Sequence, residues 1–283
     1  MASVGMATAP GAARTRRTRS RRSLTVGSGL ALGVTMMWFS LLVLIPLTAV
    51  LVSAAGLGFG EFWDVITQPQ TAAALRLTVL ESLGVTAVNV VMGTGLAWVL
   101  VRDRFWGKSL VDIVIDVPFA LPTIVAGLVL LSLYGPSSPL GVNVANTRIA
   151  VFLALAFVTL PFVVRTVQPV LESLELDVEE AAASLGAGRW TAFRRVILPS
   201  LIPAIAAGAA LSFARGISEY GSLVLLSGNL PAKTEVASVR VLTFIENGNR
   251  EAASAVAAIM LLVALLVILV LDVIQRRLAR RGD

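Results

Sequence analysis

The sequence predicts an all-α membrane protein with six transmembrane helices. Hydrophobic residues fill 57% of the 283 positions and charged residues only 14%, which is too little polar surface for a soluble protein of this size. Residues 23–60 contain no Asp, Glu, Lys or Arg, and a run of this length can cross a bilayer. A soluble fold is therefore excluded.

Five further apolar segments complete the predicted set of spans. Four of them contain no charged residue and approach or exceed the roughly 17–25 residues of a bilayer span: 82–101, 117–147, 149–164 and 252–271. The last segment, 201–226, is interrupted only by Arg215 and Glu219. We therefore predict a membrane domain over residues 24–283.

The distribution of basic residues orients these spans with both termini in the cytoplasm. In this arrangement 17 of the 23 Lys and Arg residues lie on the cytoplasmic side and five on the outer side, as the positive-inside rule requires. Residues 1–23 are rich in Ala, Gly, Thr, Ser and Arg. We expect them to form a disordered basic cytoplasmic arm.

The chain lacks the residues of most enzyme chemistry. It contains no His and no Cys, which excludes the usual zinc sites, Ser-His-Asp triads, thiol nucleophiles and disulfides. Gly107, Lys108 and Ser109 imitate the end of a phosphate-binding loop, but the required first glycine falls at Arg102. We predict a chain that is not an enzyme and that holds no metal.

Residues 165–199 form the one long cytoplasmic loop of the predicted topology. Asp177 and Glu180 have the spacing of a capping box, and Gly186 can supply the left-handed residue that ends a helix. A second helix is expected over about 189–198. The loop thus predicts a short, capped helix that presents the small residues that follow Glu180.

In this loop Glu180, Ala181 and Ala182 are followed after three residues by Gly186, and after nine more by Val196, one further residue, Leu198 and Pro199. This pattern resembles the EAA loop of the membrane subunits of binding-protein-dependent ABC importers. Val196 stands where that family usually has Ile, and the resemblance covers roughly residues 75–275. It implies the fold of a type I importer permease, with residues 177–188 as a coupling helix that docks on an ATPase. The alternative is an ordinary capped loop helix. The implied ATPase-docking residues are Glu180, Ala181, Ala182, Gly186, Leu198 and Pro199.

The resemblance also implies the partners of the chain. These are two ABC ATPase subunits, which would bind ATP and Mg²⁺, a second homologous permease subunit, and an extracytoplasmic sulfate-binding protein. No cofactor is expected in this chain, and no nucleic acid. The implied location is the bacterial cytoplasmic membrane, with the lipid bilayer around several spans.

Later segments resemble oxyanion permeases. Residues 213–221 are similar to the fifth-span signature of sulfate and molybdate permeases, and residues 227–236 and 252–255 to the T-type subunit of sulfate/thiosulfate importers. The implied function is ATP-driven import of sulfate or thiosulfate. Molybdate or another oxyanion is the alternative substrate, and half of a secondary transporter is the alternative of another class.

Arg215, Ser218 and Glu219 are the candidate substrate-pathway residues. Arg215 and Glu219 are four positions apart and would share one helix face. Ionisable groups in a span cost on the order of 2.5–3.5 kcal/mol each and face water, a partner or each other. Arg215 would attract an anion that Glu219 would repel. The sequence leaves open whether the pair lines the pathway or only fixes helix packing.

Residues 112–122 mark the entry to the third predicted span. Asp112 and Asp116 are expected to complement a helix N-terminus, and Pro118 and Pro122 to bend the span near its start. The segment 117–123 also resembles the pattern of oxyanion permeases. We predict a capped and bent span here.

Overall fold

The computed structural model describes residues 26–174, 184, 186 and 188–279. Every regular element in these residues is a helix, which confirms the all-α prediction. The predicted arm, residues 1–23, lies outside the described residues. The chain divides into two compact units, residues 1–47 and 48–283, and each is described by itself.

The first unit holds the start of the first predicted span. Helix α1 (Val26–Phe39) is followed by the π-helical turn η1 (Ser40–Leu44) and by α2 (Ile45–Gly56). Large apolar side chains are exposed on all sides of α1, such as Met37 at 62% and Trp38 at 54%. Such a surface is suited to lipid or to a protein partner within the membrane.

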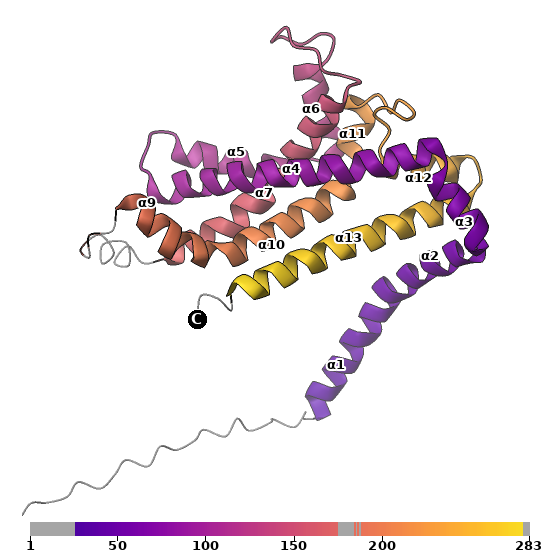
Figure 1. Ribbon diagram of the computed structural model, residues 1–283, viewed down its shortest axis with the longest axis horizontal. Helices are drawn as coiled ribbons and strands as arrows, with labels where there is room; N and C mark the ends of the chain where they lie inside the picture. Colours follow the sequence, from indigo (N-terminus) through magenta and orange to yellow (C-terminus); the bar gives the residue numbers. More distant parts are fainter. Residues whose placement is uncertain (1–25, 175–183, 185, 187, 280–283) are drawn as a thin grey trace, which may run out of the picture. The chain divides into compact units, whose positions relative to one another are not determined.

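Three long helices form the core of the second unit. They are α4 (Pro69–Arg102), α7 (Arg148–Ser173) and α10 (Leu198–Ile217), and they pack on one another, while α13 (Arg250–Ala279) lies along α10 (Figure 1). Small residues allow the close packing, as is typical in membranes. A Cβ atom at Gly93 would lie only 2.9 Å from the Cβ of Val163.

Shorter helices connect and cover this core. Helix α3 (Gly58–Thr67) leads into α4, and α12 (Ala237–Glu246) packs on α4 and α13. Helix α9 (Arg189–Ala192) and the π-helical turn η2 (Phe193–Ile197) run directly into α10. The predicted helix over 189–198 is therefore confirmed, but it continues into the span instead of stopping before Pro199.

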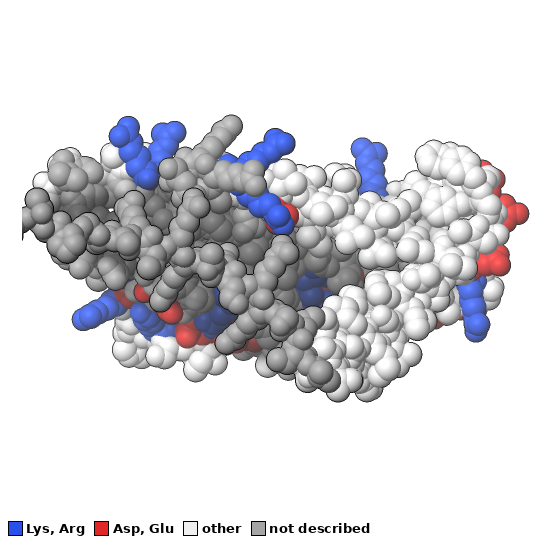
Figure 2. Space-filling view, turned by 90° about the horizontal axis from the view of Figure 1, so that it is seen from below, with Lys and Arg blue, Asp and Glu red and all other residues white. Residues whose placement is uncertain are grey.

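The positions of the predicted spans, apart from the fifth, are confirmed. Among the described residues five helices are long and apolar enough to cross a membrane, and six spans result when the bent pair α5–α6 is taken as one. In Figure 2 acidic side chains lie at the right-hand edge and again at the lower left beside basic ones, and much of the described surface between these places is uncharged. Such a surface suits an apolar environment.

Two of the predicted spans extend further than their charge-free runs. Helix α4 already begins at Pro69, so Arg76 and Glu81 lie inside it, and α7 continues to Ser173, so Arg165 is helical. The predicted cytoplasmic segment, residues 165–199, thus begins inside α7. Arg165 has acidic partners on α5, which counting charges along the chain cannot detect.

The third predicted span is broken rather than bent. Helix α5 (Lys108–Ala120) and helix α6 (Thr123–Tyr134) meet at an angle of 118°. Leu121 adopts an extended conformation (φ −87°, ψ 135°), as the residue before a proline commonly does. Asp112 and Asp116 do not complement a helix N-terminus as predicted, because both bind Arg165 instead.

The fifth span lies earlier in the chain than predicted, because the helix that runs from Trp190 to Ile217 is long enough to cross a membrane by itself. Helix α10 ends at Ile217, and the short helix α11 (Gly221–Leu226) begins after three residues. Arg215 and Glu219 therefore do not share one continuous helix face, contrary to the prediction. Gly221 follows the break and allows a close approach that a larger residue would prevent, since a Cβ atom there would collide with Thr123.

Helices α6 and α11, which follow the two breaks, pack against each other (Figure 1). A Cβ atom at Gly127 of α6 would lie 2.6 Å from the backbone oxygen of Ser222 in α11. Leu130, Leu223 and Leu226 are buried in the same apolar cluster. The contact between α6 and α11 thus requires a glycine at position 127.

We predict that Gly127→Ala destabilises the chain. The added methyl group would force α6 away from α11, and overpacking of this kind costs about 1–3 kcal/mol. Gly95→Ala is the matched control, because Gly95 is also helical and nothing lies within 4 Å of its Cβ position. Thermal unfolding of the detergent-solubilised variants measures the effect, and equal stability of the two would contradict the packing argument.

Candidate functional site

The break between α10 and α11 brings the three predicted pathway residues together. Nη2 of Arg215 lies 2.6 Å from Oε2 of Glu219. The side chain of Glu219 is fully buried, whereas that of Arg215 is 30% exposed. Ser218 donates a hydrogen bond from its hydroxyl to the backbone oxygen of Arg215 at 3.1 Å. The ion pair therefore forms across the end of α10.

Glu219 also organises the chain around the break. Its Oε1 atom accepts hydrogen bonds from the backbone N–H of Ser222 at 2.9 Å and from the Ser222 hydroxyl at 3.0 Å. Its backbone oxygen accepts from the hydroxyl of Ser238 at 2.7 Å. Oε2 makes the close contact with Arg215 outside hydrogen-bond geometry. Glu219 thus caps the first turn of α11 and ties the break to α12.

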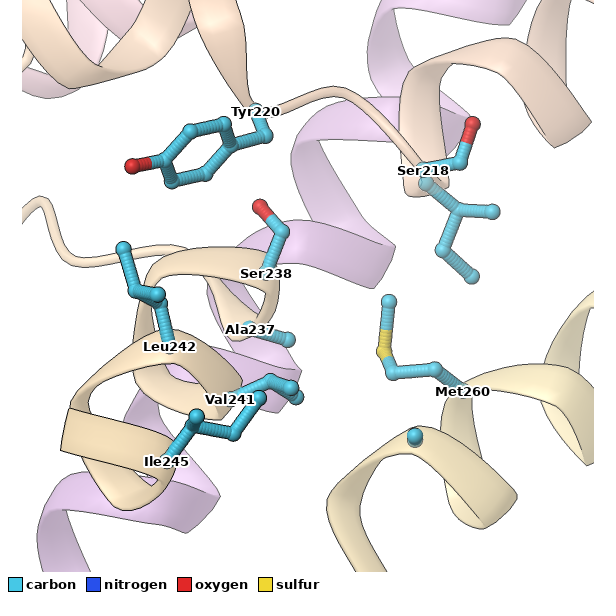
Figure 3. A pocket seen from close by; sticks show the side chains of 10 residues that line it. Ser218, Tyr220, Ala237, Ser238, Val241, Leu242, Ile245 and Met260 are labelled. Carbon is cyan, nitrogen blue, oxygen red and sulfur yellow. The ribbon is translucent and has the colours of Figure 1, made fainter. Parts of the chain in front are cut away.

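A cavity of about 440 Å³ lies beside the break (Figure 3). Residues of α12 form one wall, and Met260 of α13 lies across from them. Apart from hydroxyl groups on Ser218, Tyr220 and Ser238 the lining is apolar. Arg215 and Glu219 do not line it, so this cavity lacks the charged and N–H donors that a dianion requires.

A polar groove of about 590 Å³ runs along the N-terminal half of α4. Arg76 and Glu81 line it from α4, and Arg148 lines it from the start of α7. Arg148 donates from Nε to the backbone oxygen of Lys233 at 3.3 Å. Sequence reasoning counted these cations among the outer loops and missed the groove. The signal was available, since both Arg76 and Arg148 fall close to the predicted outer ends of spans.

The predicted ATPase-docking residues are only partly described. Glu180, Ala181 and Ala182 lie outside the described residues. Gly186 has a φ of +82°, which confirms its predicted left-handed conformation. Leu198 is half-buried and Pro199 exposed.

Helix α9, which follows Gly186 in the chain, carries an exposed aromatic residue. Trp190 is 70% exposed and stacks on Phe193, with ring centroids 5.6 Å apart. Phe193 in turn contacts Trp98 of α4 edge to face at 5.4 Å. These ring contacts connect the start of the α9–α10 helix to the core.

Relatives with high sequence identity are transport proteins. The chain is 41% identical over 269 residues to the sulfate transport system permease protein CysT of Escherichia coli (strain K12), which covers 93% of this chain and 97% of that protein. It is 44% identical over 250 residues to the protein of the same name from Synechocystis, with coverage of 86% and 87%.

Solved structures share the fold at low sequence identity. A chain of a bacterial alginate ABC transporter in complex with a periplasmic protein superposes with a TM-score of 0.73 at 19% identity, and the match covers 89% of this chain and 94% of that one. A chain of an amino acid ABC transporter superposes with a TM-score of 0.56 at 23% identity, covering 74% and 94%. These likenesses concern the fold alone.

A family model agrees with these relatives. The model described as "Binding-protein-dependent transport system inner membrane component" matches residues 89–282. This match excludes the alternative of half a secondary transporter. As a membrane component the chain is a non-catalytic subunit that binds no cofactor itself. It is a multi-pass inner membrane protein and belongs to the family of permease subunits of binding-protein-dependent ABC importers.

Proposed function

We propose that this chain is the permease subunit of an ATP-driven importer for sulfate or thiosulfate. The observation that carries the proposal is the identity of 41–44% to sulfate transport permease proteins over most of the chain. Two oxyanion-type segments support it. Residues 213–221 form the break with its ion pair, and residues 252–255 contain alanines that are buried where α13 packs on α10.

The proposal includes partners that complete the transporter. The chain would pair with a second permease subunit, dock on two ATPase subunits that bind ATP and Mg²⁺, and receive substrate from an extracytoplasmic binding protein. Support comes from the family, whose description names dependence on a binding protein. We further propose a bacterial cytoplasmic membrane with both termini on the cytoplasmic side, as the distribution of Lys and Arg requires.

The breaks at 121–122 and 218–220 would line the substrate pathway. Backbone that leaves a helix at membrane depth is tolerated only where protein buries it or where it lines a water-filled cavity. Pro122 and Ser218 are exposed at the two breaks, so in the transporter they would face water or the second permease subunit. Closure of the ATPases would move the docking segment and shift the helices between two arrangements.

The candidate pathway residues would then play different roles. Ser218 would lie at the surface of the path, and Arg215, which is 30% exposed, would keep part of its guanidinium available to an anion. Glu219 would hold Arg215 in place and cap α11. Because the Glu219 carboxylate is buried and bonded, its repulsion of a passing anion is reduced.

Sulfate uptake by the complete transporter tests the proposed substrate. We expect ATP-dependent uptake of radiolabelled sulfate into vesicles that contain this chain with its partner subunits and binding protein, and we expect thiosulfate to compete. The competing proposal is a molybdate or other oxyanion permease, which residues 213–221 also resemble. Uptake of molybdate in preference to sulfate would contradict the first proposal and support the second.

The docking segment predicts a second result. Gly186→Val would strain a left-handed backbone position, and Ala182→Glu would enlarge the proposed docking face. Both variants should insert into the membrane but lose co-purification with the ATPase or uncouple ATP hydrolysis from uptake. Gly188→Val is the matched control, since Gly188 lies close by without a positive φ. Normal transport by both variants would show that this loop is not the coupling element.

The Arg215–Glu219 pair predicts a third result. Arg215→Leu leaves a buried carboxylate without its cation, and breaking a buried pair costs about 3–5 kcal/mol. The double variant Arg215→Leu/Glu219→Gln keeps an acceptor for Ser222 and removes both charges, so its membrane abundance should recover. If Arg215 assists the anion, this abundant double variant transports sulfate poorly. Normal uptake by the double variant would eliminate the pathway role and leave packing alone.

A further inference from the structure

A charged cluster joins α5 to α7 away from the candidate site. Nε and Nη2 of Arg165 donate to the two carboxylate oxygens of Asp116, both at 2.7 Å. Nη1 donates to Oδ1 of Asp112 at 2.8 Å and to Oε1 of Gln168 at 2.6 Å, and Nη2 also donates to the Asp112 backbone oxygen at 2.8 Å. All five N–H groups of the guanidinium are therefore used, four of them on α5.

This arrangement fixes how α5 sits on α7. Asp112 and Asp116 are one helical turn apart and share one face of α5. The planar fork of Arg165 binds one carboxylate with two parallel bonds, which imposes direction as well as distance. A second contact between the two helices is apolar, the edge-to-face pair of Phe119 and Phe162 at 5.0 Å. Apolar contacts allow one helix to slide along the other, whereas the paired hydrogen bonds of the Arg165 guanidinium do not.

Stability alone is a weak reason for such a cluster. The side chains of Arg165, Asp112 and Asp116 are 28%, 42% and 50% exposed, and partly exposed pairs contribute little net free energy of folding. Apolar residues of similar volume often stabilise a buried contact at least as well. The best-attested use of such groups is to hold one register between elements.

The cluster lies between two parts of the chain that transport must connect. Helix α7 ends at Ser173, about two turns beyond Arg165, and the proposed ATPase-docking segment comes next in the chain. Helix α5 leads directly into the break at Leu121 and Pro122. We propose that Arg165 is a positioning residue that makes α5 follow α7, so that movement of the docking segment reaches the broken span. This inference rests on the proposed function.

The test compares coupling in assembled transporters. Arg165→Gln should leave complex assembly and basal ATP hydrolysis in place. Sulfate uptake per ATP hydrolysed should fall by about tenfold, a size typical of coupling between sites. Asp116→Asn, which removes one carboxylate charge and preserves shape, should show a smaller loss. Arg165→Lys keeps the charge without the fork and should not restore coupling. Arg276→Gln, which breaks the exposed Arg276–Asp272 pair of α13, is the control and should transport normally.

A tether distinguishes positioning from mere stabilisation. The chain contains no Cys, so Phe119→Cys and Phe162→Cys can be joined by a short bifunctional thiol reagent across their observed contact. In the Arg165→Gln background the tether should restore uptake, and without the Arg165 change the tethered pair should transport as before. Three results would each overturn the proposal. The first is a tether that does not restore uptake, and the second is normal coupling in Arg165→Gln. The third is loss of assembly in both Arg165→Gln and Asp116→Asn.

Failure of the proposed function gives a different result. If the unaltered chain does not co-purify with an ATPase or does not import sulfate, then the function proposed above is wrong regardless of Arg165. If the unaltered complex imports another oxyanion, the same variants are compared with that anion. A defect confined to the Arg165 and Asp116 variants is the result that supports the positioning role.

Discussion

The lack of water in the bilayer core is the constraint on which the rest of the structure depends. Because lipid offers no hydrogen-bond partners, backbone groups in a span must be satisfied within helices, and helices are what the described residues contain. Departures from a helix at membrane depth are therefore informative. The described residues contain one within a candidate span, at 121–122, and a second break follows a full-length span at 218–220; the helices after the two breaks pack against each other through Gly127 and Gly221.

The sequence predicts the position of most spans because hydrophobic length is a local property. Prediction from the sequence fails where a residue's surroundings depend on contacts between segments that are distant in the chain. Arg165 ends a charge-free run, and its bonds to Asp112 and Asp116 of α5 could not be read from that run. The break at Ser218 had weaker local signals, chiefly the glycines on either side of it. Pro122 was a clear signal of a bend, although not of its 118° size.

The residues of the candidate site were predicted from the sequence, but their hydrogen bonds and positions relative to the end of α10 were not. The spacing of Arg215 and Glu219 indicated an ion pair, which the structure contains. The capping role of Glu219 towards Ser222 could not be predicted, because it arises only when α10 ends early. The left-handed position of Gly186 was predicted correctly from turn chemistry. The polar groove lined by Arg76 and Arg148 required the packing of two helices.

The central claim is that the two breaks face a water-filled path between permease subunits, and access of a hydrophilic thiol reagent to the breaks tests it most directly. Single cysteines at Leu121 and Ser218 would be introduced into this cysteine-free chain, with Leu266, exposed on the apolar surface of α13, as the lipid-facing reference. In the assembled transporter, with and without ATP, both break cysteines should react in at least one state while the cysteine at 266 does not. Break cysteines as unreactive as the one at position 266 in both states would contradict the account.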